Sequence, residues 1–333
     1  MYVIFKFDKE FVFILIIFLI ISFIETILFE NQDIFNNYLL IDSFPLLLFI
    51  FIYGIEKIFS SSYNQSKERL ILFQTKKKKI HNKIKIYLYI ICILILNFIV
   101  YYITPKSFDE YYQINQFIPL IFFFINEKII FKNEIYSHHI LSMIIILIIN
   151  LYVILILFNK INKISFFIYN ILYGYCYSLC LSLVKFINTN YDISVFLIGF
   201  LFGLSQLILS INEINSFIDI IKNNFLYCLI MIFNYLIYDY LHFYVLKKYT
   251  PIHTKICEFF SLIVYWLYVG NYYISVVLII IFNIISSMIY LEIIELNFCE
   301  LNKNLKTKIC NRGDYEMSID SKEVNQSNSS FEQ

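Results

Sequence analysis

Long apolar stretches recur along the chain, and short polar segments separate them. A window of about 19 residues, suited to finding membrane helices, predicts helices at 11–29, 38–56, 84–103, 115–131 and 139–158. A polar connector at 159–164 is followed by five more, at 165–187, 193–213, 222–246, 253–269 and 273–292. The pattern predicts an all-α, polytopic membrane protein with about ten transmembrane helices.

The connector divides the chain into two five-helix halves, 1–158 and 165–295. Five crossings reverse the direction of entry, so a structural repeat between the halves has to be inverted. The fourth and ninth helices have the shortest apolar runs, 116–126 and 259–269. Such short segments at matching positions of two halves point to a transporter's binding site. The remaining residues, 296–333, form a polar tail that we expect to be disordered from about residue 311.

Composition and charge set the orientation. Apolar residues make up 60% of the chain, charged residues 15%, and the net charge is +1. With both termini in the cytosol, all but four of the 26 Lys and Arg residues fall on the cytosolic side. We therefore expect a multi-pass protein with both ends cytosolic. No strongly basic region is present that would favour nucleic acid as a partner.

Few residues suit catalysis or metal binding. Among the five histidines, His138 and His139 are adjacent, so their side chains are expected to diverge by about 100 degrees on a helix and not to share one ion. No metal site and no cofactor are predicted. Asp239 and His242 differ, because an i, i+3 spacing puts them on one helix face. Asp239 is the most deeply placed carboxylate, which makes it a candidate proton carrier or cation partner; an interfacial position is the alternative.

Neutral amides stand near the middle of several predicted helices. Asn97, Gln206 and Asn234 are candidates to line a polar cavity, with hydrogen bonding between helices as the alternative. Lys185 is the nearest candidate for a fixed cation that an anionic solute would need. Other charged residues near helix ends are interpreted as boundary residues; they include Glu258 and Glu292.

Several motifs resemble one family. They are the run from Tyr173-Gly174 to Lys185 with Gly199 beyond it, the segment 250–253 that opens the ninth helix, and the segment 289–299 that follows the tenth. With the ten-helix plan, these motifs resemble the drug/metabolite transporter superfamily, in the divergent form that is similar to the nucleotide-sugar-transporter-like and EamA-like proteins of protists. The resemblance implies two inverted five-helix repeats, a central cavity and alternating access.

Three classes of function follow from this pattern. The first is a secondary transporter of a small polar metabolite, with a solute and the lipid bilayer as its partners and the fourth, sixth, eighth and ninth helices lining the path. The second is a membrane enzyme acting on lipid or lipid-linked sugar, with Asp239 and His242 as acid and base or as metal ligands. The third is a non-transporting membrane scaffold. The transporter is the main hypothesis, without enzyme activity, and a homodimer is left open.

Overall fold

The fold is seen in a computed structural model, which describes residues 3–5, 8–28, 38–64, 76–107, 118–132, 136–161, 164–191, 193–211, 214–269 and 274–296. Nearly all of these residues are helical. The helices are α1 (Lys9–Leu28), α3 (Tyr38–Asn64), α4 (Lys76–Ser107), α6 (Ile118–Phe131), α7 (Ser137–Ile161), α8 (Ile164–Tyr191), α9 (Val195–Leu209), α10 (Ile214–Asn223), α11 (Phe225–Lys248), α12 (Pro251–Val269) and α13 (Ile274–Tyr290). Two short strands, β1 (Val3–Phe5) and β2 (Ile294–Leu296), form one antiparallel pair.

The predicted α-helical class is confirmed, and each predicted apolar range coincides with a helix. The short helix α10 falls between the seventh and eighth ranges and was not predicted as an element of its own. Within the predicted connector, α7 ends at Ile161 and α8 begins at Ile164. The predicted tail at 296–333, with the disorder expected from about residue 311, lies outside the described residues except for residue 296.

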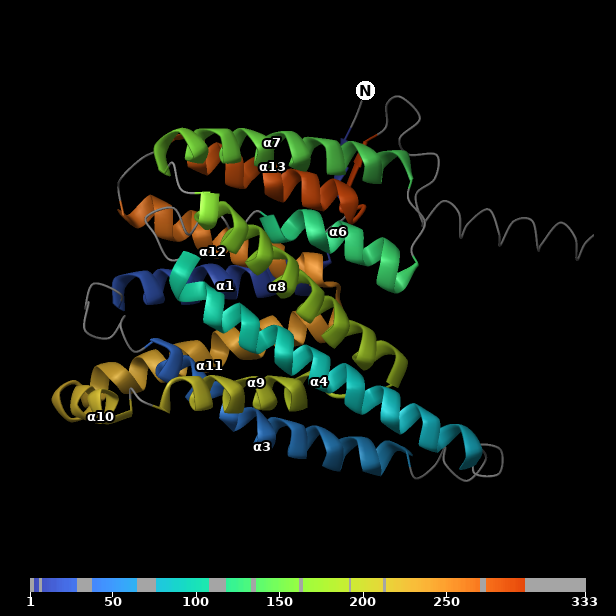
Figure 1. The fold of residues 1–333 in the computed structure, drawn as a ribbon, viewed down its shortest axis with the longest axis vertical. Coiled ribbons are helices and arrows are strands. Elements are labelled where there is room, and N and C mark those ends of the chain that lie inside the picture. Colours follow the sequence, from blue (N-terminus) through green and yellow to red (C-terminus); the bar gives the residue numbers. More distant parts are fainter. Residues whose placement is uncertain are drawn as a thin grey trace, which may run out of the picture.

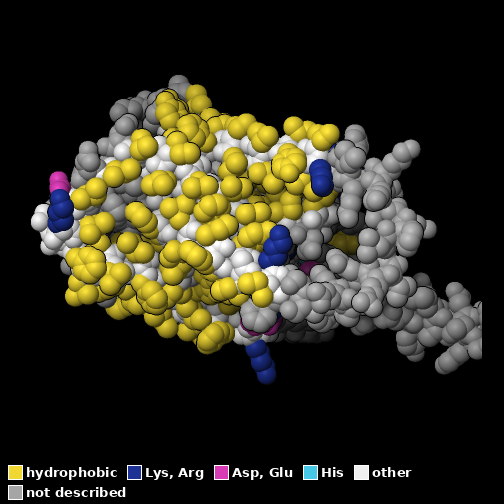
Figure 2. Space-filling view, turned by 90° about the horizontal axis from the view of Figure 1, so that it is seen from below, with side chains coloured by type: hydrophobic (Ala, Val, Ile, Leu, Met, Phe, Trp, Pro, Cys, Tyr) yellow, Lys and Arg dark blue, Asp and Glu magenta, His cyan; other side chains and the backbone are white. Residues whose placement is uncertain are grey.

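By length and composition, three helical segments in the described part of the chain could each cross a membrane: Lys83–Ile103, Ile168–Tyr191 and Phe225–Lys248. Shorter apolar segments occur at Ser137–Tyr152, Val195–Leu209 and Val277–Tyr290. The side chains have the distribution expected in lipid, because large apolar groups such as Phe51 and Leu226 are each 68% exposed. Figure 2 shows such groups covering one face, with charged side chains near its margins.

The helices pack as a layered bundle (Figure 1). The helices α7 and α13 lie against each other at one edge, and α3 lies against α9 at the opposite edge. Between these edges, α8 packs against α4 and α6, while α1 packs against α11 and α12. The centre of the bundle is therefore built from helices of both halves.

The contact between α3 and α9 depends on a glycine. A Cβ atom added at Gly203 would lie 2.7 Å from Leu46 Cβ and 3.0 Å from the backbone oxygen of Ser43. The missing side chain lets the two helix backbones approach closely, as small residues do between membrane helices. Phe49 of α3 then packs edge-on against Phe243 of α11, with ring centroids 5.5 Å apart, which joins a third helix to the pair.

Polar contacts gather at the end of the bundle where the described chain begins. The Tyr249 hydroxyl donates to Asp8 at 2.7 Å, and the Tyr244 hydroxyl donates to Glu10 at 2.7 Å. Glu10 also pairs with Lys248. Hydrogen bonds from the Tyr249 hydroxyl and from the Glu10 amide lower the pKa of Asp8. These contacts fix the start of α1 to the end of α11.

The same end of α11 also joins α3, α8 and α9. Lys247 pairs with Glu56 of α3, and Glu56 accepts a hydrogen bond from Ser194, the N-cap of α9. Lys185 of α8 donates to the backbone oxygen of Lys247 at 2.7 Å. Five segments that the charge pattern assigns to one side of a membrane thus meet at one end of the bundle: the chain start, the end of α3, the end of α8, the start of α9 and the end of α11.

Candidate functional site

A buried ion pair lies in the first half of α12. Lys255 has no exposed surface, and its Nζ donates to Glu258 Oε2 at 2.6 Å. The i, i+3 spacing places both side chains on one face of the helix. A charge this deeply buried is stable only when it is paired and hydrogen-bonded. The stability of the protein therefore depends more on the geometry of this pair than on that of any surface pair.

Two neighbouring helices complete the site at the other oxygen of the carboxylate. The Tyr177 hydroxyl of α8 donates to Glu258 Oε1 at 2.5 Å. His242 Nδ1 of α11 lies 3.6 Å from the same oxygen. Glu258 therefore receives contacts from both of its neighbours and from Lys255, and the group joins α8, α11 and α12. We call Tyr177, His242, Lys255 and Glu258 the central polar cluster.

Aromatic rings enclose the ammonium group of the cluster. Lys255 Nζ lies 5.2 Å from the centroid of the Tyr177 ring and 5.6 Å from that of the Phe259 ring. The face of an aromatic ring attracts a cation, so the rings hold the ammonium group without adding a second negative charge. Tyr173 stacks on Tyr177 one helical turn away, which supports the orientation of that ring.

The structure places two of the predicted site residues near this cluster. His242 belongs to it, and Asp239 lies one turn earlier on α11 with a half-buried side chain. Glu258, interpreted from the sequence as a boundary residue, is instead at the centre of the cluster. The boundary interpretation is wrong because the Glu258 side chain is only 13% exposed and is enclosed by contacts from α8 and α11, about 10 Å from the start of α12 at Pro251.

The other predicted residues lie at separate helix contacts. Asn97 of α4 donates to Ser205 of α9 at 2.8 Å, and Gln206 of α9 donates to the Tyr101 hydroxyl of α4. Asn234 of α11 donates to the backbone oxygen of Ile21 in α1 at 3.5 Å. The structure does not gather these amides with the central polar cluster.

The cation of the site is also different from the one predicted. Lys185 sits at the polar end, on the backbone of Lys247, whereas Lys255 is the fully buried cation. The charge pattern placed Lys255 among loop residues, and Tyr177 was not singled out. The spacing of Lys255 and Glu258 within one helix could have indicated their pairing. Nothing in the sequence indicated that Tyr177 would face them.

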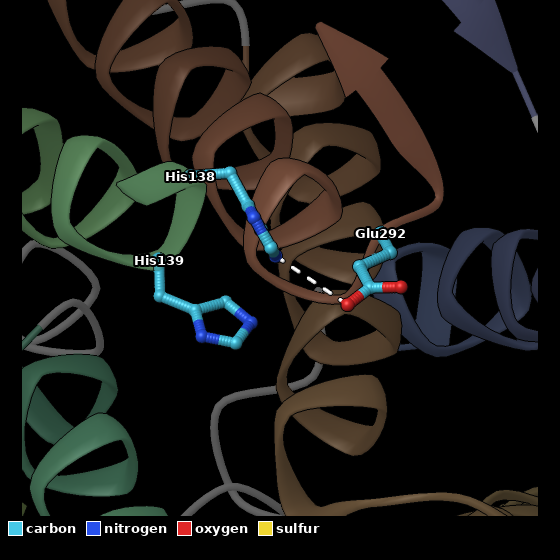
Figure 3. A group of neighbouring side chains, drawn as sticks. All are labelled: His138, His139 and Glu292. Atoms are coloured by element: carbon cyan, nitrogen blue, oxygen red, sulfur yellow. Dashed lines mark ion pairs between the residues drawn. The ribbon is translucent and has the colours of Figure 1, made fainter. Parts of the chain in front are cut away.

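A second polar group joins α7 to the turn after α13 (Figure 3). His138 Nε2 lies 3.4 Å from Glu292 Oε1, and the ring centroids of His138 and His139 are 4.1 Å apart. The prediction that the two adjacent histidines diverge is wrong. Both residues stand in the first turn of α7, and both rings reach the end of α13, His138 at Glu292 and His139 at the Tyr290 ring.

Comparison with known proteins does not assign the chain to a family. No family model matches the chain, and no curated protein matches it. The resemblance to the drug/metabolite transporter superfamily stays a prediction from the motifs and from the helix plan.

Proposed function

We propose that this chain is a secondary transporter, which moves a small polar metabolite across a membrane by alternating access. The observation that carries the proposal is the buried pair of Lys255 and Glu258, joined by His242 and Tyr177 from two other helices. Ionisable groups inside membrane helices are costly and mark pathways for solutes, ions or protons.

The position of the cluster agrees with the helices expected to line a path. The fourth, sixth, eighth and ninth predicted helices correspond to α6, α8, α11 and α12. Three of these four supply the cluster, and α6 packs against both α8 and α12. A solute that reaches the cluster would therefore be surrounded by helices from both halves.

The packing of the helices supports an inverted repeat. Exchanging α1 with α8, α3 with α9, α4 with α11, α6 with α12 and α7 with α13 converts most observed contacts into other observed contacts. The α4–α8 contact becomes α11–α1, α6–α8 becomes α12–α1, and α4–α9 becomes α11–α3. The α3–α9, α6–α12 and α7–α13 contacts map onto themselves. Five contacts have no equally extensive counterpart in the first half: those of α11 with α8, α9 and α12, and those of α8 with α9 and α12. The central polar cluster lies among α8, α11 and α12.

The strand pair supports an even number of crossings. Its register pairs Val3 with Leu296, Ile4 with Glu295 and Phe5 with Ile294. A chain that begins and ends its helical region in one two-stranded sheet has both of these points on the same side of a membrane. Together with the distribution of Lys and Arg, this favours ten crossings with both ends in the cytosol.

The cluster offers a way to exchange partners. Lys255 and Glu258 neutralise each other, so the empty site carries no net charge from the pair. An anionic or polar group of the solute would replace Glu258 as the partner of Lys255. A proton on Glu258, or positive charge on His242, would then neutralise the released carboxylate, which couples solute binding to proton binding.

The proposal is tested with purified full-length protein in liposomes. The vesicles are loaded with a mixture of amino acids, sugars, sugar phosphates and nucleotide sugars, and the loss of each compound is followed by mass spectrometry. We expect protein-dependent loss of one class, reduced at least about tenfold in Glu258→Gln, as expected when a group that assists proton transfer is removed. Asp219→Asn is the matched control, because Asp219 is 71% exposed on α10. Vesicles with folded wild-type protein that lose no compound faster than empty vesicles contradict the proposal.

Asp239 is the predicted coupling residue on the same helix as His242. With the transported compound identified, Asp239→Asn is expected to abolish uptake driven by a pH difference, since an amide cannot carry the proton. Exchange of the compound without a pH difference should continue. Unchanged pH-driven uptake would remove this role and leave Glu258 as the coupling carboxylate.

A further inference from the structure

A compact group of potential metal ligands lies away from the central polar cluster. His138 is 2% exposed and His139 is 5% exposed, while the side chain of Glu292 is 13% exposed. Each of the three offers one ligand atom, and these atoms all lie within 4.8 Å of one another. Figure 3 shows His138 and Glu292 pointing toward each other, with the His139 ring beside them.

The imidazole of His138 is buried without hydrogen bonds. Within the part of the chain that the structure describes, neither of its ring nitrogens has a hydrogen-bond partner. Buried polar atoms in proteins are almost always satisfied, so an exception calls for a physical reason. Oε1 of Glu292 lies 3.4 Å from Nε2. An ion between the two side chains would engage Nε2 of His138.

The backbone at Glu292 gives an independent indication. Glu292 follows α13 with a φ angle of 59°, in the left-handed region. The Ile293 amide donates to Met288 O at 2.9 Å and the Glu292 amide donates to Ile289 O at 3.2 Å, which is the Schellman ending of a helix. This position normally holds glycine, because a Cβ atom is strained there. The backbone strain at Glu292 is consistent with a role for its carboxylate.

Neighbouring residues hold the group in place. Ser142 of α7 donates to the Ser286 backbone oxygen of α13 at 2.5 Å, which sets the register of the two helices beside the site. The Tyr290 ring lies 4.6 Å from the His139 ring and restricts its position. The Tyr136 amide donates to His139 Nδ1 at 3.2 Å. His139 gives up this hydrogen bond when it binds an ion, because a neutral imidazole has a single acceptor nitrogen.

We propose that His138, His139 and Glu292 bind a divalent first-row transition metal ion, with Zn²⁺ as the probe. Two imidazoles and one carboxylate are ligands that Zn²⁺ accepts, and water would occupy the remaining position. Ligand atoms around tetrahedral Zn²⁺ lie about 3.3 Å apart, close to the 3.4 Å between His138 Nε2 and Glu292 Oε1. The ion would clamp α7 to the end of α13, the last helices of the two halves. This inference does not depend on transport.

The test uses tag-free, full-length protein stripped with a chelator. Zn²⁺ binding is measured by competition with a colorimetric chelator, and metal content after desalting is measured by mass spectrometry. We expect one Zn²⁺ per chain in the wild-type protein. His138→Gln, His139→Gln and Glu292→Gln should each weaken binding at least about tenfold, the lower end of what loss of a supporting contact costs.

A matched control separates the site from general effects. His253→Gln removes a half-buried histidine elsewhere in the bundle and is expected to bind Zn²⁺ like the wild-type protein. Co²⁺ bound to wild-type protein should give the visible absorption of a tetrahedral or five-coordinate site, a readout that needs no variant to fold. Wild-type protein that retains no Zn²⁺ overturns the proposal. So does equal weakening by His253→Gln, or unchanged binding in all three ligand variants.

Discussion

At the scale of single residues, the central polar cluster shows how a buried charge is accommodated. Both oxygens of Glu258 are engaged, Oε2 by Lys255 and Oε1 by Tyr177 and His242. Such a pair adds little net stability compared with apolar residues, but the loss of one member leaves an uncompensated buried charge. Replacing one member of the pair is therefore expected to destabilise the protein more than removing both charges does.

Lys255→Met is predicted to destabilise the protein by about 3–5 kcal/mol, because Glu258 loses its counter-charge. The double variant with Glu258→Gln removes both charges and should recover part of that loss. Thermal unfolding in detergent, followed by circular dichroism, measures both. A double variant no more stable than Lys255→Met would show that the pair is not the source of the effect.

The control for this prediction has the same spacing on the surface. Asp219 and Lys222 of α10 form an i, i+3 pair with side chains 71% and 69% exposed. Exposed pairs contribute about 0–1 kcal/mol. Lys222→Met should therefore change the unfolding temperature far less than Lys255→Met does.

At the scale of helices, close packing depends on where small residues fall. Gly203 of α9 faces the backbone of α3, whereas Gly54 of α3 has no atom within 4 Å of an added Cβ. Glycine is thus part of a close helix contact at Gly203 and faces open space at Gly54. Of these two glycines, Gly203 is the one at which the absence of a side chain determines how near the helices come.

Gly203→Ala is predicted to destabilise the fold by about 1–3 kcal/mol, because the added methyl group forces the helices apart. Gly54→Ala should be neutral or slightly stabilising, since alanine is the better helix former. Thermal unfolding in one detergent compares the two variants. Equal stability of both would contradict the close contact between α3 and α9.

At the scale of the whole molecule, the bundle has apolar side chains outside and many of its polar side chains inside. Asn150, Gln206 and Asn283 are each at most 1% exposed, while many phenylalanine and isoleucine side chains face outward. This distribution is stable when lipid surrounds the bundle, since lipid cannot hydrogen-bond to polar groups. The β1–β2 pair then ties the first and last described elements to one end.

Tags placed before residue 3 and after residue 296 are predicted to lie on the same face of the membrane, in the cytosol. Protease protection in sealed vesicles measures the side of each tag. A tag inserted next to α10, at the opposite end of the bundle, serves as the control and should lie on the opposite face of the membrane from the other two tags. Ends on different faces would contradict an even number of crossings.

The sequence by itself determined the helices and their approximate bounds. A long apolar run surrounded by polar residues has one stable solution in lipid, a helix with its backbone hydrogen bonds satisfied internally, so local composition is sufficient. It also determined which segments gather at the polar end, because the Lys and Arg residues are concentrated in every second loop between the helices. His242 was identified for the same local reason, a polar residue inside an apolar run.

Only the tertiary structure decided which polar groups meet. Tyr177 and Glu258 are 81 positions apart, and no local pattern relates them. Lys255 was counted with the charges of a cytosolic loop, although the predicted ninth helix at 253–269 includes it; the structure buries its side chain completely within α12. The convergence of His138 and His139 on Glu292 depends on side-chain rotation and on the packing of α7 against α13. Such contacts arise from the way distant helices fit together, which the order of apolar and polar residues in each helix does not specify.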